Sequence, residues 1–286
     1  MAIVLDNITY TYGVGTPFEK TALHGISLTI KNGEFLGVIG HTGSGKSTFV
    51  QHLNGLLHPT TGTVTVNGVD ISASTEEAKK MRHKVGMVFQ YPEHQLFEET
   101  IAEDIAFGPK NLGLSADEVD ERVRDAMKFV GLDYNTYAER SPFHLSGGQM
   151  RRVAIAGVVA MNPDFLVLDE PSAGLDPFGR EEIFEEIIRL HKEKGITVIL
   201  VSHNMEDISR MASRLVVLDK GRIVLDGEPM DIFNNHRDEL QAVGVDIPPV
   251  SVTMEYLREQ GLDVSNRVLS VDDAVQAILE GGSHVK

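Results

Sequence analysis

Apolar and polar residues alternate with a period of two in three segments near the N-terminus, residues 3–12, 23–30 and 62–66. Such alternation is typical of strands that bury one face and expose the other. The third segment is followed by Asn67-Gly68, a dipeptide that favours tight hairpin turns. We therefore expect an antiparallel β portion near the N-terminus.

Later strands are shorter and apolar throughout. We expect strands at Phe35–Ile39 and at residues 85–89, and the two apolar runs at residues 165–168 and 196–201 are typical of parallel strands covered on both faces. A hairpin, residues 215–219 and 222–225, turns at Lys220-Gly221. Together these segments predict an α/β fold with a mixed or parallel sheet.

Helical periodicity lies between these strands. One helix is expected from Lys46 onward, with an apolar face formed by Phe49, Val50, Leu53, Leu56 and Leu57. Further helices are expected at residues 117–130, from Ser146 and at residues 180–193. Residues 91–163 are largely helical and are expected to form a subdomain.

The composition changes after about residue 233, and Pro248-Pro249 interrupts the chain. Two short helices are expected beyond that point, near residues 253–260 and 271–280. Ser270 and Asp273 have the spacing of a helix cap, and Gly281 stands at the expected helix end. We therefore divide the chain into residues 1–233 and a small C-terminal helical appendage, residues 234–286.

Charge and composition narrow the classes of partner. The 286 residues carry 42 acidic and 26 basic side chains, a net charge of −16, which disfavours nucleic acid and anionic lipid as partners. Cysteine is absent, so disulfides, thiolate metal sites and cysteine nucleophiles are excluded. We expect neither a signal peptide nor a membrane span, because no apolar run approaches about 18 residues. Any membrane role would require a membrane partner.

A glycine-rich segment follows the strand Phe35–Ile39 and fits the pattern G-x-x-x-x-G-K-[ST]. Glycines let the backbone turn its N–H groups toward one anion, and the helix that follows adds its positive end. Lys46 is expected to bind the β- and γ-phosphates, and Ser47 to offer its hydroxyl to Mg²⁺. The plainer interpretation is a glycine turn before a helix. The predicted phosphate-binding residues are Gly40, His41, Thr42, Gly43, Ser44, Gly45, Lys46, Ser47 and Thr48.

Two carboxylates, Asp169 and Glu170, come directly after the apolar run 165–168. Ligands of open α/β sheets bind at this carboxyl end of the strands. Asp169 is therefore expected to hold Mg²⁺, and Glu170 to act as general base on an attacking water. The alternative is an exposed acidic turn before Pro171. The chain has no Asn-Lys-x-Asp motif, which counts against a GTPase.

The segment Leu145-Ser146-Gly147-Gly148-Gln149, called the signature segment below, precedes an expected helix. Ser146 and Gln149 have the spacing of a capping box. The two glycines leave backbone N–H groups open at a helix N-terminus, which suits a second anion site. Taken alone, the segment could equally be only a capped helix start.

The signature segment lies between the phosphate-binding loop and residues 165–170. This arrangement resembles an ABC ATPase, and the resemblance covers roughly residues 1–233. It implies that Gln90 is the Q-loop glutamine, a catalytic residue and magnesium ligand, and that His203 is a catalytic switch histidine. It implies a D-loop, residues 172–176, in which Asp176 contacts nucleotide. Tyr12 is the expected adenine-stacking aromatic, with Tyr10 as a competitor.

The resemblance also implies a head-to-tail dimer with ATP between the subunits. Ser146, Gly147, Gly148 and Gln149 would then complete the ATP site of the partner subunit. His203 would contact the γ-phosphate and the attacking water. The implied ligands are ATP and Mg²⁺.

Several segments resemble more narrowly the ATPases of energy-coupling factor (ECF) transporters, which take up vitamins or metal ions. These segments are residues 54–57, 90–97 and 104–109. Residues 15–19 and 141–143 resemble the second, A′, ATPase of such systems. The implied partners are a second ATPase in a heterodimer, a membrane T component that binds the Q-loop groove near Glu93, and a membrane S component. The implied location is the cytoplasmic face of the membrane, with the appendage strengthening the dimer.

Three alternatives stay open at this point. A soluble ABC ATPase acting on nucleic acid or ribosomes usually has two such domains or a long insertion, and this chain has one signature. A non-hydrolysing regulatory subunit would be expected to have replaced Glu170 or His203. An ATPase of another ABC importer would share every motif of the broader family.

Overall fold

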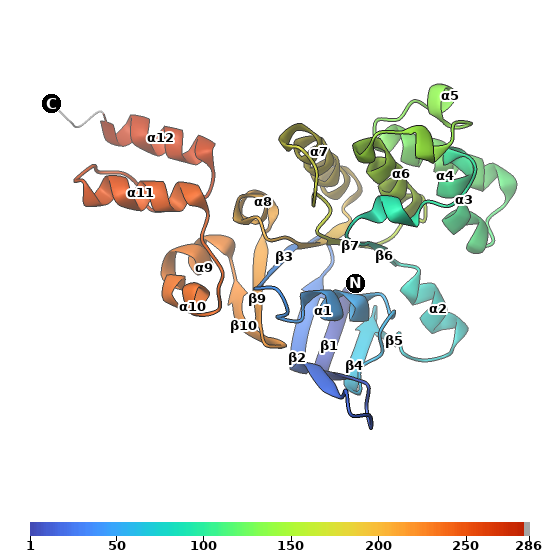
Figure 1. Ribbon diagram of the computed structural model, residues 1–286, viewed down its shortest axis with the longest axis horizontal. Helices are drawn as coiled ribbons and strands as arrows, with labels where there is room; N and C mark the ends of the chain where they lie inside the picture. Colours follow the sequence, from blue (N-terminus) through green and yellow to red (C-terminus); the bar gives the residue numbers. More distant parts are fainter. Residues whose placement is uncertain (283–286) are drawn as a thin grey trace.

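The computed structural model describes residues 1–282, which form two sheets with helices around them (Figure 1). The first sheet is antiparallel, in the order β2-β1-β4-β5. Its strands are β1 (Ala2–Tyr12), β2 (Lys20–Lys31), β4 (Thr61–Val66) and β5 (Val69–Asp70). The predicted antiparallel N-terminal portion is therefore confirmed.

The second sheet has the strand order β10-β9-β3-β8-β7-β6 and is parallel except for the β9–β10 hairpin. Four of its strands, β3, β6, β7 and β8, have every residue buried, as their continuous apolar runs predict. The strands are β3 (Phe35–Ile39), β6 (Val85–Val88), β7 (Phe165–Asp169), β8 (Thr197–Val201), β9 (Arg214–Asp219) and β10 (Arg222–Gly227).

Each face of the second sheet belongs to a different core. In β3, Leu36 and Val38 point toward the antiparallel sheet and α1 (Lys46–Leu53), whereas Phe35 and Ile39 point toward the helices on the other side. The alternation of side chains along a strand produces this division. The two cores hold the carboxyl ends of β3, β7 and β8 side by side.

The helices on the far side form the predicted helical subdomain and the helices that flank it. The subdomain contains α3 (Ile101–Asn111), α4 (Ala116–Phe129), α5 (Tyr134–Tyr137), α6 (Gly147–Val159) and the short 3-10 helices Pro92–Gln95 and Pro142–His144. Beside it lies α7 (Pro177–Lys194), with α8 (Met205–Met211) on the other side of α7, while α2 (Glu76–Arg82) follows β5.

Two sequence predictions of helix bounds were wrong. The helix from Lys46 ends at Leu53, because Asn54 caps it and Gly55 adopts a positive φ of 75°. Leu56 therefore lies outside the helix and is 55% exposed. The helix expected at residues 180–193 begins earlier, at Pro177, because the Asp176 carboxylate caps it.

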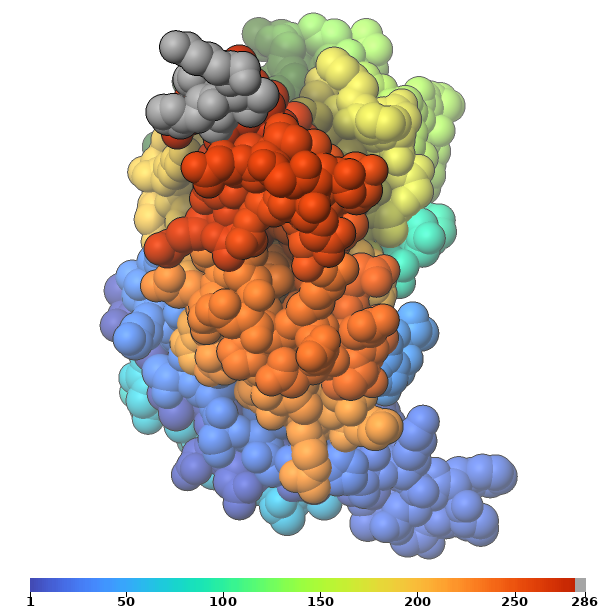
Figure 2. Space-filling view, turned by 90° about the vertical axis from the view of Figure 1, so that its left-hand side faces the viewer, coloured from blue at the N-terminus to red at the C-terminus, as the bar shows by residue number. Residues whose placement is uncertain are grey.

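The C-terminal part contains α9 (Pro229–Asn235), α10 (Arg237–Ala242), α11 (Pro249–Glu259) and α12 (Val271–Gly282). Phe233, Leu240 and Val245 belong to the main core, whereas Met254 and Val268 belong to a separate small cluster. Figure 2 shows this part, in orange and red, along one side of the molecule. We propose that the appendage begins near Pro249.

Ser270 caps α12 as predicted, since its hydroxyl accepts the backbone N–H of Asp273 at 3.1 Å. The helix continues to Gly282, so Gly281 lies inside its last turn. Among residues 1–282, no helix combines the length and the apolar character that crossing a membrane requires.

Candidate functional site

The phosphate-binding loop leaves β3 and enters α1 at Lys46, as the motif predicts. Gly40 has φ 150°, and a Cβ there would lie 2.3 Å from the carbonyl oxygen of Leu218 in β9. Gly45 has φ 107°, a conformation that other residues rarely adopt. Glycine at both positions therefore lets the loop pass close to β9 and turn into the helix.

Lys46 is held by the loop itself. Its Nζ donates to the carbonyl oxygens of Gly40 at 2.6 Å and His41 at 3.1 Å, and the residue is only 7% exposed. Burial lowers the pKa of Lys46, while the carboxylates of Glu170 and Asp169 raise it. The ammonium thus lies between the loop and the acidic pair, where a phosphate chain would meet it.

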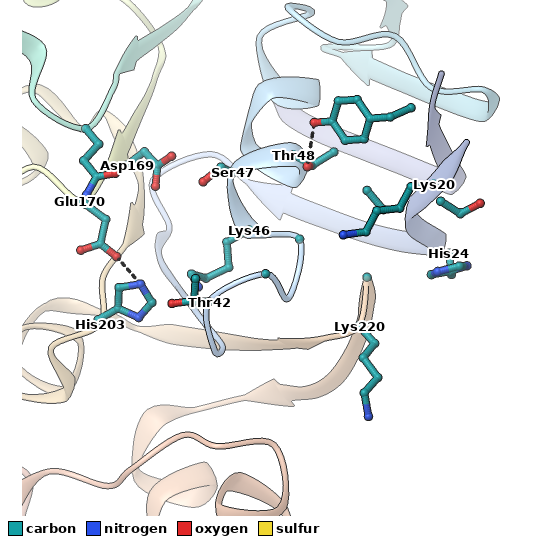
Figure 3. Close-up of a pocket in the computed structure, with 17 residues that line it drawn as sticks. Lys20, His24, Thr42, Lys46, Ser47, Thr48, Asp169, Glu170, His203 and Lys220 are labelled. Carbon is teal, nitrogen blue, oxygen red and sulfur yellow. Dashed lines mark hydrogen bonds and ion pairs between the residues drawn. The ribbon is translucent and has the colours of Figure 1, made fainter. Parts of the chain in front are cut away.

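A pocket of about 620 Å³ opens beside this loop (Figure 3). The two carboxylates and His203 lie on one side of it, and Lys20 and His24 on the other. The pocket brings together the predicted residues Tyr12, Thr42, Gly43, Gly45, Lys46, Ser47, Thr48, Gln90, Asp169, Glu170 and His203. The predicted phosphate and catalytic residues therefore share one cavity.

Glu170 and His203 form the centre of this site. His203 Nε2 lies 3.0 Å from Glu170 Oε1, and Glu170 adopts a left-handed φ of 54° at the exit of β7. Burial and, to a lesser extent, the charge of nearby Asp169 together raise the pKa of Glu170 to about 7, against the opposing effect of Lys46. Burial also lowers the pKa of His203. A carboxyl group that titrates near neutral pH suits a general base.

Asp169, Ser47 and Gln90 all line the pocket and are possible magnesium ligands. Burial raises the pKa of Asp169, and a hydrogen bond from Ser47 and the charge of Lys46 oppose this effect. These groups offer oxygen donors, the kind that Mg²⁺ prefers. No cluster of three or more His, Asp or Glu side chains suited to a metal occurs within residues 1–282. The donor set therefore fits a magnesium ion that also uses phosphate and water.

Tyr12 lines the pocket and Tyr10 does not. The Tyr12 ring is 42% exposed, and its hydroxyl lies 3.1 Å from Thr48 Oγ1. Tyr10 packs edge-on against Tyr12 and His52. Of the two aromatics considered from the sequence, Tyr12 alone offers an accessible ring face to a ligand in this pocket.

Three predicted loop residues support the loop without lining the pocket. At Gly40 the loop backbone passes close to β9. His41 Nε2 lies 2.9 Å from Asp219 Oδ1, and Ser44 is fully buried. The prediction that every residue from Gly40 to Thr48 contacts the ligand stays a prediction for the whole loop. The observed contacts of these three residues hold the loop against the neighbouring strand.

The signature segment has the predicted capping box. Ser146 Oγ accepts the N–H of Gln149 at 3.3 Å, and the N–H of Ser146 donates to Gln149 Oε1 at 3.1 Å. A Cβ added at Gly147 or Gly148 would meet nothing within 4 Å. None of these four residues lines the pocket, and neither does Asp176, which caps α7. Within one chain they are thus separate from the phosphate-binding loop.

The predicted contact of a membrane T component near Glu93 stays a prediction, and the Glu93 carboxylate already has a partner in its own chain. Glu93 accepts two hydrogen bonds from Arg151 of the same chain, at 3.0 and 2.8 Å. Arg151 is 2% exposed and also donates to the carbonyl oxygens of Pro171 and Ala173. Through Arg151 the pair joins the segment after β6 to the segment after β7, and no local sequence pattern predicts this contact.

Sequence reasoning missed a second group of pocket residues, on β2 and the β9–β10 hairpin. They are Lys20, Thr21, Ala22, His24, Lys220 and Gly221. Lys220-Gly221 was interpreted only as a turn. Because β9 pairs in parallel with β3, its carboxyl end lies beside the phosphate-binding loop. The strand order, which the sequence does not reveal, was the missing signal.

Comparison with known proteins places these motifs in a family. Residues 23–173 match the family model described as ABC transporter. The energy-coupling factor transporter ATP-binding protein EcfA2 of Clostridium tetani is 54% identical over 280 residues, covering 98% of this chain and 97% of that protein. The chain belongs to the ABC transporter ATP-binding proteins. EcfA2 of Bacillus cereus strain ATCC 10987 is 50% identical, and the match covers 99% of this chain and 98% of the Bacillus protein.

Solved structures agree with the ABC fold. CbiO1 of Clostridium perfringens, part of the ABC transporter complex cbiONQ, has a TM-score of 0.73 and 36% identity, covering 84% of this chain and 94% of that chain. The dimeric ATP-binding cassette MJ0796, in a post-hydrolysis state with ADP and Pi, has a TM-score of 0.70 and 31% identity. The match covers 79% of this ABC ATPase and 98% of that chain. The predicted P-loop NTPase fold is confirmed.

Proposed function

We propose that this chain is the ATP-hydrolysing subunit of an energy-coupling factor transporter, of the EcfA2 kind. The observation that carries the proposal is the Glu170–His203 pair, which lies in the same pocket as Lys46 and the phosphate-binding loop. A regulatory subunit that only binds nucleotide would not need this pair. Similarity to EcfA2 proteins over nearly the whole chain supports the transporter class.

In this proposal ATP binds along the pocket from Tyr12 to the acidic pair. Tyr12 stacks on adenine, and the loop N–H groups and Lys46 bind the phosphates. Ser47, Gln90 and Asp169 would hold Mg²⁺, which neutralises phosphate charge when bound. Pocket lining and oxygen donor chemistry support this assignment.

Glu170 accepts a proton from the attacking water, and His203 orients the water and the terminal phosphate. The raised pKa of Glu170, near 7, matches a base that must take up a proton at neutral pH. Lowering of the His203 pKa by burial and by Lys46 favours the neutral imidazole. Both residues leave their strands at the carboxyl edge of the sheet, β7 for Glu170 and β8 for His203.

The signature segment and Asp176 act on a second ATPase subunit. Their position outside this chain's own pocket supports a head-to-tail pair in which Ser146, Gly147, Gly148 and Gln149 face the partner's nucleotide. The open N–H groups at the start of α6 suit a phosphate. The preferred pair is a heterodimer with a related ATPase, strengthened by the appendage.

The complex further contains a membrane T component, which binds beside the Q-loop, and a membrane S component, which selects a vitamin or metal ion. The ATPase lies at the cytoplasmic face of the membrane. An ATPase of another ABC importer would share the hydrolytic site but assemble with different membrane proteins.

Co-expression with the T and S components and the second ATPase, followed by affinity purification through a tag on this chain, tests the assignment. We expect all four chains to co-elute from detergent and to hydrolyse ATP, with activity lost in Lys46→Ala. Co-elution without hydrolysis would contradict the enzyme assignment. Hydrolysis without co-elution would contradict the ECF assignment while leaving the ATPase intact.

A further inference from the structure

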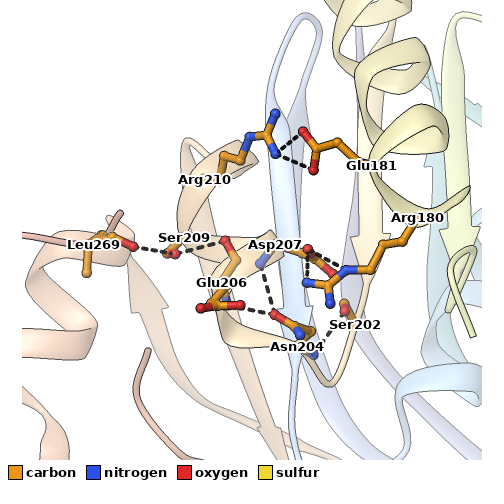
Figure 4. A network of polar contacts seen from close by, with 9 residues as sticks. All are labelled: Arg180, Glu181, Ser202, Asn204, Glu206, Asp207, Ser209, Arg210 and Leu269. Atoms are coloured by element: carbon orange, nitrogen blue, oxygen red, sulfur yellow. Dashed lines mark hydrogen bonds and ion pairs between the residues drawn. The ribbon is translucent and has the colours of Figure 1, made fainter. Parts of the chain in front are cut away.

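A part-buried ion pair joins the helix after the D-loop to the helix after His203 (Figure 4). Arg180 Nε and Nη2 donate to the same oxygen, Asp207 Oδ1, at 3.1 and 2.5 Å. Arg180 lies in the first turn of α7, just after Asp176, and Asp207 lies in the first turn of α8. The contact therefore connects two segments that both leave the nucleotide-binding edge of the sheet.

The start of α8 is ordered by its own cap. Asn204 Oδ1 accepts the N–H groups of Glu206 and Asp207 at 2.9 and 3.2 Å, and the N–H of Asn204 donates to Ser202 Oγ at 3.0 Å. These bonds define the local shape of the turn that contains His203. All of these hydrogen bonds join residues between 202 and 207. They therefore do not hold the turn in place relative to α7.

His203 has little packing of its own to hold it, since its side chain is 52% exposed. Its distance to Glu170 must therefore depend on where the backbone between β8 and α8 stands. Asp207 is 6% exposed, and its Oδ2 has no hydrogen-bond partner among the described residues. A buried carboxylate anchored through one oxygen depends strongly on its arginine, because losing that partner would leave a charge uncompensated.

We propose that Arg180 and Asp207 form a positioning pair that sets His203 against Glu170. The inference rests on the proposed hydrolytic function, because it assigns a purpose to the position of His203. Neither residue lines the nucleotide pocket, so the pair acts on hydrolysis through His203 and not on ATP binding. Through this pair, the position of His203 also depends on α7, the helix that follows Asp176.

A second pair between the same helices provides a matched control. Arg210 Nη1 lies 2.5 Å from Glu181 Oε1, again joining α8 to α7. Both side chains are nearly half exposed, at 45% and 47%, and the pair lies farther along α8 from His203. An exposed pair of this kind contributes little to holding two helices together. If any link between α7 and α8 sufficed, the two pairs would respond alike.

The experiment compares Asp207→Asn, Arg180→Lys and the control Arg210→Gln in the full chain within its purified transporter complex. Steady-state ATP hydrolysis gives kcat, and fluorescence titration with a labelled ATP analogue gives Kd. We expect Asp207→Asn to lower kcat about tenfold, since small misplacements of catalytic groups are costly, with Kd within about twofold of the parent. Arg210→Gln should keep kcat within about twofold.

The decisive arm repeats Asp207→Asn in a His203→Ala background. If Asp207 acts through His203, the second substitution should not lower kcat further. An unchanged kcat in Asp207→Asn, or an equal further loss without His203, would overturn the proposal. If Asp207→Asn does not fold, Arg180→Lys decides: it keeps the buried charge compensated but loses the forked contact, and an unchanged kcat would likewise overturn the pair. A parent complex that does not hydrolyse ATP would instead refute the proposed function.

Discussion

His203 Nε2 lies 3.0 Å from Glu170 Oε1, although the two residues follow different strands of the sheet. The parallel pairing of β7 with β8 brings them together at one edge. Because a half-exposed imidazole touches a carboxyl whose pKa is raised to about 7, the pair forms the reactive end of the pocket. Lys46 and the phosphate-binding loop form the binding part.

Replacement of His203 by alanine should reduce hydrolysis without abolishing ATP binding. The ring contacts Glu170, whereas the phosphates have Lys46 and the loop N–H groups. We expect kcat to fall by about 10²- to 10³-fold, the range for losing a group that stabilises a transition state, while Kd for the ATP analogue changes little. A parallel loss of binding would indicate that His203 holds ATP rather than promoting its hydrolysis.

Gly148→Asp should separate ATP binding by this chain from hydrolysis in the dimer. Gly148 has open space around it and does not line this chain's pocket, so the fold and its own nucleotide site should persist. A carboxylate at the start of α6 would repel the phosphates of ATP held by the partner subunit. We expect normal thermal stability and nucleotide Kd for the isolated chain, with hydrolysis by the complex reduced at least about tenfold. Full activity would contradict the head-to-tail arrangement.

Replacing Arg151 should lower the stability of the fold strongly. It is 2% exposed, pairs with Glu93 through two hydrogen bonds and donates to two carbonyl groups. Arg151→Gln would leave the Glu93 carboxylate without its main partner, at a cost of about 3–5 kcal/mol of unfolding free energy in urea. Arg124→Gln removes an exposed pair with Asp120 and should cost less than about 0.5 kcal/mol. Similar losses for the two variants would contradict this assignment.

The Glu186 carboxyl should make the stability of the fold depend on pH. Burial raises its pKa from 4.5 to about 7, and its Oε2 has no hydrogen-bond partner within the described residues. Between those pH values the unfolded chain releases a proton that the folded chain keeps, so this group makes stability fall as pH rises and then level off. Glu186→Gln should raise the unfolding free energy at pH 8 by about 1–3 kcal/mol and change it little at pH 4.5.

The exposed neighbour Glu185 provides the control for this prediction. Urea unfolding of Glu185→Gln and Glu186→Gln at both pH values measures the difference between the two sites. An effect of Glu186→Gln that is the same at the two pH values would mean that folding does not raise the pKa of this carboxyl.

The sequence predicted those parts of the molecule that local patterns determine. The alternation in β1 and β2, the apolar runs of β3, β7 and β8, and the capping box at Ser146 all depend on neighbouring residues. Strand order depends on contacts between residues far apart in the chain. For that reason Lys20 and Lys220 at the pocket edge went unpredicted, as did the pairing of Glu93 with Arg151, 58 residues apart.

The candidate site shows the same difference between local patterns, which the sequence reveals, and contacts between distant residues, which it does not. Local motifs identified Lys46, at the start of α1, and Asp169 and Glu170, at the end of β7, while the family resemblance identified His203. The Arg180–Asp207 contact could not be read from the chain, since an arginine on one helix and an aspartate on another are ordinary surface residues until the fold buries them. Asp207 is 6% exposed.

The most direct test of the account is a single-turnover assay of ATP hydrolysis by the purified transporter complex carrying Glu170→Gln in this chain. Glutamine keeps the size of the side chain but cannot take up a proton as the carboxylate does. If the partner ATPase also hydrolyses ATP, its own catalytic base is replaced in both complexes, the one with Glu170→Gln and the one with Glu170 intact. The two complexes then differ only at Glu170. We predict that ATP stays bound and that hydrolysis falls by about 10²- to 10⁴-fold relative to the complex with Glu170 intact. Hydrolysis at the same rate in the two complexes would contradict the assignment of Glu170 as general base.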